Sequence, residues 1–245
     1  MTTNVFAPHR LRRLFAADAV NIARDPTLLY VVVLSVLPAL AGFFFRDALN
    51  SAVESNFGLA GVFEMILPML LCLPAFLLGW VTGFLFLEER DDGPLLAVDT
   101  TPVGKRGLMA YRIATAATLT FAMTLFACAL LLPERGIAVA LAVAVMVAAD
   151  AVCVALVLPA LARNKVEGLA LIKVANVFAM APLLALVPGA WRFAGGLVPT
   201  FWIGELILNA PDFPDAGFLL AAGAGIATHL LVVWLFFRLQ ARRAG

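Results

Sequence analysis

One acidic residue, Asp150, lies deep inside a long apolar stretch of this 245-residue sequence. A carboxylate at the centre of a membrane span costs about 3 kcal/mol on insertion scales, so its side chain should face other helices or a wet cavity. Helix rise puts Asp150 about 16 Å from the end of its apolar run at Leu161, and Lys173 about 8 Å into the next run from the same side.

Asp150 and Lys173 have three possible roles. Because consecutive spans are antiparallel and the lysine stem is long, the two side chains can form an ion pair that fixes the packing of their spans. Alternatively, Asp150 contacts a substrate or carries a proton. In the third interpretation, Lys173 simply extends its ammonium group to the lipid headgroups.

A second group of polar residues forms the most charged connection between two apolar runs, at 84–108. It opens with the charged residues 88–92, of which Asp92 is a suitable N-cap for a short helix with an apolar ridge at 95–98. Pro102 limits that helix, because the residue before a proline disfavours the α conformation. Such a helix, held at a membrane surface between acidic flanks, is suited to a groove in another protein. The alternative is an ordinary solvated loop.

The composition is that of a polytopic membrane protein. Apolar residues make up 63% of the chain and charged residues only 13%, with a mean hydropathy of +1.00, which excludes an ordinary soluble domain. The net charge of +1 gives no indication of nucleic-acid binding. Cys72, Cys128 and Cys153 all fall in apolar runs, so we interpret them as small hydrophobic residues rather than as a disulfide framework.

No catalytic motif is present in the sequence. It contains no G-x-x-x-x-G-K-[ST] phosphate loop, no H-E-x-x-H and no G-x-S-x-G. We therefore expect no enzyme activity, and no cofactor or metal bound by this chain. His9 and His229 are far apart in the sequence, and we expect His229 to face the bundle as a hydrogen-bonding residue.

Six apolar runs are long enough to cross about 30 Å of hydrocarbon, which needs roughly 20 residues. We place them at Thr27–Phe45, Gly61–Leu87, Met109–Leu132, Gly136–Leu161, Gly168–Leu186 and Gly217–Phe237. The predicted fold class is therefore all-α, with six transmembrane helices in one transmembrane domain over 1–245.

The distribution of basic residues predicts the orientation. With the N-terminus in the cytoplasm, fourteen of the seventeen Lys and Arg residues lie on the cytoplasmic side, and only Arg46, Arg135 and Arg192 lie outside. Both termini are therefore predicted to be cytoplasmic, as is the charged segment at 84–108. The cytoplasmic residues are Arg10, Arg12, Arg13, Arg24, Arg90, Lys105, Arg106, Arg112, Arg163, Lys165, Lys173, Arg238, Arg242 and Arg243.

Two further elements are predicted outside the six spans. The basic segment 1–26 is predicted to contain an amphipathic helix in the plane of the membrane interface, with a partly ordered tail as the alternative. The outer loop 187–216 contains Phe201–Leu208, which we expect to dip back into the interface as a short re-entrant helical hairpin. An aromatic belt with no further role is equally compatible with its composition. The tail 238–245 is basic and cytoplasmic.

Several of these segments together resemble the permease subunits of ABC-2-type transporters. The charged segment carries Leu87-Glu88-Glu89-Arg90, Gly93, Leu95-Leu96 and Thr101-Pro102 in the order of the coupling segment of bacterial drug-efflux permeases, with Pro94 where threonine is usual. The turn 164–168 reads N-x-x-x-G before Lys173, and Pro199 to Trp202 reads P-x-x-W, both as in that family. The resemblance covers nearly the whole chain.

This resemblance implies the membrane subunit of an ABC exporter in the bacterial cytoplasmic membrane. The expected partners are a separate ABC ATPase subunit that holds ATP and Mg²⁺, a second permease subunit, and membrane lipids. The expected cargo is a drug, an antibiotic or a lipid-like amphiphile. The residues expected to dock the ATPase are Glu88, Glu89, Asp92, Leu95, Leu96, Thr101, Pro102, Lys165 and Glu167.

The alternative function is an ion-coupled secondary transporter with Asp150 as its proton site. The sequence shows no internal repeat relating the first three spans to the last three, which disfavours that class. A membrane scaffold without transport activity is the third possibility.

Overall fold

A computed structural model describes residues 20, 26–92 and 104–243. These residues are almost entirely helical, without a β-strand among them, and six of the helical segments are long and apolar enough to cross a membrane. The all-α prediction with six spans is thus confirmed. The predicted helices in 1–26 and at 95–98 lie outside the described residues. The long helices are α2 (Pro26–Phe57), α3 (Val62–Asp92), α5 (Gly104–Leu131), α6 (Gly136–Leu161), α7 (Lys165–Ala175) and α9 (Ala216–Arg243).

Three 3₁₀ helices and one short α-helix complete this part of the chain. The turn η1 (Pro133–Arg135) joins α5 to α6, and η2 (Asn176–Leu186) continues α7 to complete the fifth span. Between the fifth and sixth spans lie η3 (Ala190–Leu197) and α8 (Phe201–Leu208). The helix α8 has the predicted bounds, while its entry into the interface as a re-entrant hairpin stays a prediction.

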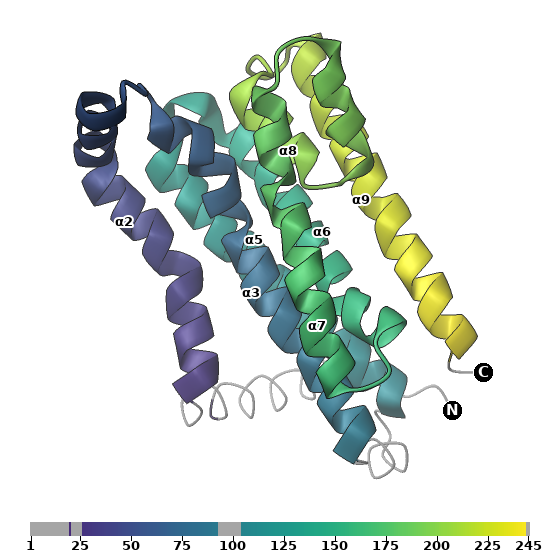
Figure 1. The fold of residues 1–245 in the computed structure, drawn as a ribbon. Helices are drawn as coiled ribbons and strands as arrows, with labels where there is room; N and C mark the ends of the chain where they lie inside the picture. The colour runs from purple at the N-terminus through teal and green to yellow at the C-terminus, as the bar shows by residue number, and fades with distance from the viewer. Residues whose placement is uncertain (1–19, 21–25, 93–103, 244–245) are drawn as a thin grey trace.

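The bundle has two ends, which Figure 1 places at the bottom and the top. The predicted inner end is where α3 and α6 finish and α7 begins, together with the first residue of α2 and the last of α9. The predicted outer end carries η1, η3 and α8. The names follow the charge-based prediction of which end faces the cytoplasm.

The first span is longer than its hydropathy predicts. The expected span ends at Phe45, before the first charged residue, whereas α2 continues to Phe57. Its polar extension is held by α3, because Arg46 Nη2 lies 2.7 Å from Glu64 Oε1 and Asn50 donates a hydrogen bond of 3.0 Å to Glu64 Oε2. A boundary placed at the first charge is therefore too early here.

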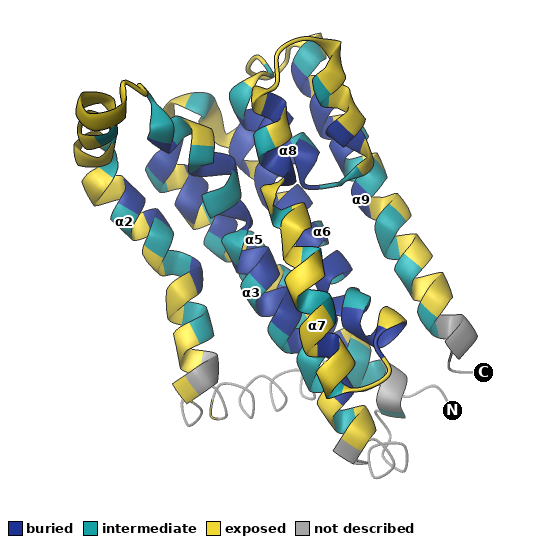
Figure 2. Cartoon of the chain, viewed as in Figure 1, coloured by how far each residue is buried: buried dark blue, intermediate teal, exposed yellow. Residues whose placement is uncertain are grey.

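The centre of the bundle is the pair α3 and α6. In the most apolar stretch of each, 61% of residues are buried, compared with 17% in α2 and 17% in the span formed by α7 and η2. Figure 2 shows this difference as dark blue on the central helices and yellow along α2 and α7. The helices α3 and α6 therefore form the core against which the other spans pack.

Two glycines allow α3 and α6 to approach closely. A Cβ atom on Gly79 would lie 2.7 Å from Val154 Cβ and 3.0 Å from the carbonyl oxygen of Ala151, and one on Gly83 would lie 3.0 Å from the carbonyl oxygen of Ala155. Glycines four residues apart form the small-residue face that brings membrane helices into backbone contact. This contact fixes the heights of Trp80 on α3 and Asp150 on α6, which are direct sequence neighbours of Gly79 and Ala151.

The fifth span changes from α-helix to 3₁₀ helix at Asn176. Pro182 has no backbone N–H, so the α-helical hydrogen bond to the carbonyl of Phe178 cannot form. The hydroxyl of Thr200 donates to that carbonyl instead, at 2.9 Å. A 3₁₀ stretch inside a longer helix often marks a hinge.

Candidate functional site

The most deeply buried polar contact in the described part of the chain joins α6 to α9. His229 Nε2 lies 3.1 Å from Asp150 Oδ1, and the two side chains are 1% and 4% exposed. The other ring nitrogen, Nδ1, lies 2.6 Å from the carbonyl oxygen of Gly225, one helical turn earlier. The prediction that His229 faces the bundle and forms a hydrogen bond is confirmed.

His229 and Asp150 lie within ion-pair distance but do not form a well-aligned hydrogen bond. Nδ1 faces the carbonyl oxygen of Gly225, which can only accept, so Nδ1 carries a hydrogen. Nε2 lies 3.1 Å from Asp150 Oδ1 and has no hydrogen-bond partner among the described residues.

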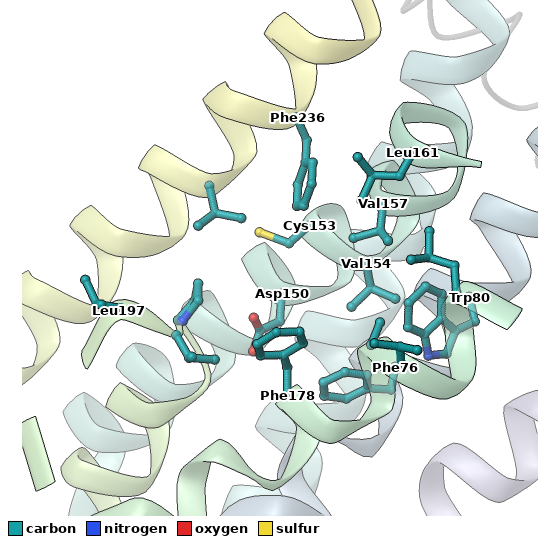
Figure 3. A pocket seen from close by; sticks show the side chains of 16 residues that line it. Phe76, Trp80, Asp150, Cys153, Val154, Val157, Leu161, Phe178, Leu197 and Phe236 are labelled. Carbon is teal, nitrogen blue, oxygen red and sulfur yellow. The ribbon is translucent and has the colours of Figure 1, made fainter. Parts of the chain in front are cut away.

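The second carboxylate oxygen, Asp150 Oδ2, is buried and has no hydrogen-bond partner among the described residues. Asp150 lies in the wall of a cavity of about 260 Å³ (Figure 3). The other lining residues are almost all apolar and come from α3, α6, the fifth span, residues 197–199 and α9. We call this space the Asp150 cavity.

Aromatic side chains form much of the wall of the Asp150 cavity. Phe76 and Trp80 come from α3, Phe178 from η2 and Phe236 from α9. The indole N–H of Trp80 donates a hydrogen bond of 2.9 Å to Asn176 Oδ1, at the junction of α7 and η2. The cavity therefore combines aromatic faces with one carboxylate oxygen and borders the change of helix type in the fifth span.

A second cavity of about 310 Å³ is also lined by Phe76 and Trp80. Its remaining lining comes from the preceding turns of α3, including Met69 and Leu73, and from Asn176 and Ala179 of η2. The two cavities thus share Phe76 and Trp80 as a common wall.

The structure does not bring the predicted pair Asp150 and Lys173 together. Asp150 contacts His229, whereas the Lys173 side chain is exposed and forms no ion pair with Asp150 among those of the described residues. The contact between His229 and a carboxylate was not predicted. The available signal was the presence of a second polar residue inside an apolar run, but a sequence does not say that the fourth and sixth spans are neighbours.

The residues predicted to dock an ATPase lie at the predicted inner end, where the described ones form a charged network. Lys165 Nζ lies 3.3 Å from Glu88 Oε1, and the Lys165 backbone N–H donates to Asp91 at 3.0 Å. Arg90 donates to the carbonyl of Ala162 at 2.9 Å. The end of α3 is thereby tied to the turn between α6 and α7.

Two further contacts extend this inner network. Glu89 lies 2.6 Å from Arg112 of α5, and both side chains are mostly buried. Asn164 caps α7 by accepting from the backbone N–H of Glu167 at 2.9 Å, while Glu167 accepts from the N–H of Arg163 at 2.8 Å. The carboxylates of Glu89 and Glu167 are therefore engaged within this chain, and the Glu88 side chain is about half exposed.

For the remaining predicted docking residues, the structure does not test the predicted contact with an ATPase. Asp92 is the last residue of α3. Leu95, Leu96, Thr101 and Pro102 lie outside the described residues.

The predicted outer end is held by two arginines. Arg192 of η3 forms a two-pronged ion pair with Glu205 of α8, with N–O distances of 2.9 and 3.0 Å. Arg135 of η1 lies 2.6 Å from Asp212 and donates to the carbonyls of Ile207 and Ala210 at 2.8 Å. These arginines join η3 to α8, and the η1 turn to the end of α8.

Comparison with known proteins identifies relatives of this chain. The family model described as "Fluoroquinolones export permease protein Rv2686c-like" matches residues 18–237. Two relatives from Mycobacterium tuberculosis, the fluoroquinolones export permease proteins Rv2686c of strain H37Rv and MT2760 of strain CDC 1551, are each 27% identical over 96% of both chains. No solved structure matches the chain.

Proposed function

This chain belongs to the family of Rv2686c-like fluoroquinolones export permease proteins, and on that premise we propose that it is the membrane subunit of an ATP-driven drug exporter. It is a multi-pass membrane protein whose six long helices match the expected spans. The observation that carries the proposal is the family match over residues 18–237, which includes five of the spans in full and most of the sixth. ATP and Mg²⁺ would be held by a separate ATPase subunit, in the bacterial cytoplasm.

The proposed ATPase contact is the predicted inner end. Its footing comprises two connections, the segment after α3 and the turn before α7. The inner network ties the end of α3 to that turn. In the first, Leu95 and Leu96 supply the apolar ridge, flanked by Glu88, Glu89 and Asp92 on one side and by Thr101 and Pro102 on the other. In the second, Lys165 and Glu167 stand in the first turn of α7.

The fifth span connects this footing to the wall of the Asp150 cavity. Lys165 begins α7, which changes to 3₁₀ helix at Asn176, and Asn176 accepts the hydrogen bond of Trp80 in the cavity wall. A displacement of α7 by the ATPase would therefore alter the wall of the cavity. We propose that this is how ATP hydrolysis on the partner changes access to the cargo.

A second permease subunit belongs to the same proposal. In α2 and in the fifth span only 17% of the most apolar residues are buried within the chain, so these helices offer the largest uncovered apolar surfaces. Lipid covers part of such a surface, and a second subunit would cover the remainder. Homodimers and heterodimers fit this surface equally well.

Co-purification tests the exporter proposal. The chain, expressed with its natural operon and extracted in mild detergent, is expected to retain an ATPase, and Leu95→Asp/Leu96→Asp is expected to lose it because two carboxylates cannot enter an apolar groove. The matched control is Leu59→Asp, an exposed leucine near the predicted outer end. Absence of any ATPase from the wild-type preparation would refute the proposal, as would equal loss in the control.

The buried contact between Asp150 and His229 favours a second candidate, an ion-coupled transporter, because an acid inside a span can carry a proton. Drug efflux from energised cells separates the two functions. Export that stops when the proton gradient is collapsed while ATP is maintained supports ion coupling, and export that stops when ATP is depleted while the gradient is maintained supports the ATPase partner.

A further inference from the structure

We propose that the Asp150 cavity binds the protonated amine of an aromatic cargo, with the ammonium group on Asp150 Oδ2 and the ring system between the aromatic walls. The inference rests on the proposed export function and specifies the chemical class of the cargo and the place where it binds. The site lies within one chain and needs no residue from a second subunit.

The unpartnered carboxylate oxygen is the first reason. A buried polar atom without a hydrogen bond costs roughly 1–3 kcal/mol, more when charged, and a native protein rarely leaves one without cause. Asp150 Oδ1 is already engaged by His229, while Oδ2 has no partner among the described residues. An N–H donor entering the cavity would supply the missing bond, and a cationic donor would form a charge-assisted one.

The aromatic walls are the second reason. Phe76, Trp80, Phe178 and Phe236 line the same space as Asp150, as Figure 3 shows. Aromatic faces attract cations within about 6 Å and stack on planar rings. The volume of about 260 Å³ is sufficient for part of a drug-sized molecule, such as an amine-bearing ring with its neighbour.

Other occupants fit the Asp150 cavity less well. A lipid acyl chain would satisfy the apolar walls but would leave Asp150 Oδ2 unpaired. An anion would be placed beside a carboxylate with no basic residue among the lining side chains. A metal ion would find too few ligands, because the described residues contain no group of three His, Cys, Asp or Glu side chains placed to hold one.

Binding of a matched pair of compounds tests the proposal. The probes are a fluoroquinolone with a free piperazine amine and the same compound acetylated on that nitrogen, which removes both the positive charge and the N–H donor and adds an acetyl group. Binding to the purified full-length chain in lipid nanodiscs is measured by equilibrium dialysis at a pH where the amine is protonated. The wild type is expected to bind the amine compound about tenfold or more tightly than its acetylated form, the effect of one charge-assisted hydrogen bond.

Substitutions then assign that preference to Asp150. Asp150→Asn is expected to bind both compounds equally, while Asp150→Glu keeps part of the preference. The matched control, Asp47→Asn, removes one carboxylate from an exposed position on α2 and should behave as the wild type. A full preference for the amine in Asp150→Asn would overturn the proposal.

A second variant covers the case in which Asp150→Asn does not fold. Ala175→Trp adds an indole to the cavity wall without removing any polar group, and it is expected to weaken binding of both compounds at least tenfold. Undiminished binding of both compounds by this variant, shown to be monodisperse by gel filtration, would place the drug elsewhere and overturn the proposal.

The dialysis experiment needs no ATPase, so the two proposals can fail separately. If wild-type cells export the drug with ATP but Asp150→Asn retains the amine preference, the cavity assignment fails and the exporter stands. If the preference depends on Asp150 but no ATPase partner exists, the binding site stands and the ATP-driven function fails.

Discussion

The two ends of the bundle are held together by different kinds of polar contact. At the predicted outer end, Arg192 pairs with Glu205, whose side chain is 8% exposed, and Arg135 bonds backbone carbonyls at the end of α8. At the predicted inner end, Lys165 Nζ lies 3.3 Å from Glu88 Oε1, and these side chains are about one-third and one-half exposed. The mostly buried pair of Glu89 and Arg112 joins α3 to α5 at the same end.

This difference indicates which of the two contacts can be rearranged. A buried, two-pronged ion pair is costly to break, because opening it leaves a charge without a partner in an apolar setting. An exposed lysine–glutamate pair contributes little, since water replaces each partner. The contact between η3 and α8 is therefore the fixed one, and the side-chain link between α3 and the start of α7 is where a partner subunit can rearrange contacts at little cost.

The largest expected effect is at the outer end. Glu205→Ala leaves Arg192 unpaired and should lower the free energy of unfolding by about 3 kcal/mol or more. Thermal unfolding in detergent measures this loss. Asp212→Ala is the matched control, because the Asp212 side chain is 60% exposed and Arg135 keeps its carbonyl partners. Equal losses in both variants would show that the outer end is not held by its buried pair.

A smaller effect is expected where α8 packs against η2. A Cβ atom on Gly204 would collide with the backbone of Pro182, so Gly204→Ala must push α8 away from the fifth span. We expect a loss of about 1–3 kcal/mol, the usual cost of overpacking, in the same thermal measurement. Gly223→Ala is the control, since a Cβ on Gly223 meets nothing within 4 Å. If Gly204→Ala is as stable as that control, the close packing of the outer end is refuted.

The smallest effect on stability is expected at the inner end. Lys165→Glu should change the free energy of unfolding by no more than about 1 kcal/mol, because the pair with Glu88 is exposed. Drug accumulation in cells should nevertheless rise, since the side-chain link between Lys165 and Glu88 is replaced by repulsion between two carboxylates. Restoring the pair in reverse, with Glu88→Lys added to Lys165→Glu, should recover part of the export. Unchanged export in the single variant would remove this contact from the transmission path.

Much of the fold can be predicted from local sequence alone. Six apolar runs of sufficient length determine six helices, because a backbone in hydrocarbon must satisfy its hydrogen bonds internally. The predicted bounds of α6 and α8 agree with the structure, since Gly136 and Leu161, like Phe201 and Leu208, stand where apolar runs meet turn residues. The extension of α2 beyond Phe45 could not be predicted, because it depends on Glu64 of the next helix.

In the candidate site too, some features follow from local sequence and others depend on a neighbouring helix. Because Asp150 and His229 are each polar within an apolar run, their shielding from lipid can be predicted without a structure. The packing of the helices is needed to show that the two side chains meet, and that Asp150 contacts His229 rather than Lys173. Helix periodicity fixes the direction of a side chain relative to its own axis, whereas the contacts between helices follow from packing, here of α9 against α6, where a Cβ atom on Gly225 would collide with Met146. Packing also created the Asp150 cavity, whose aromatic walls come from residues as far apart in the sequence as Phe76 and Phe236.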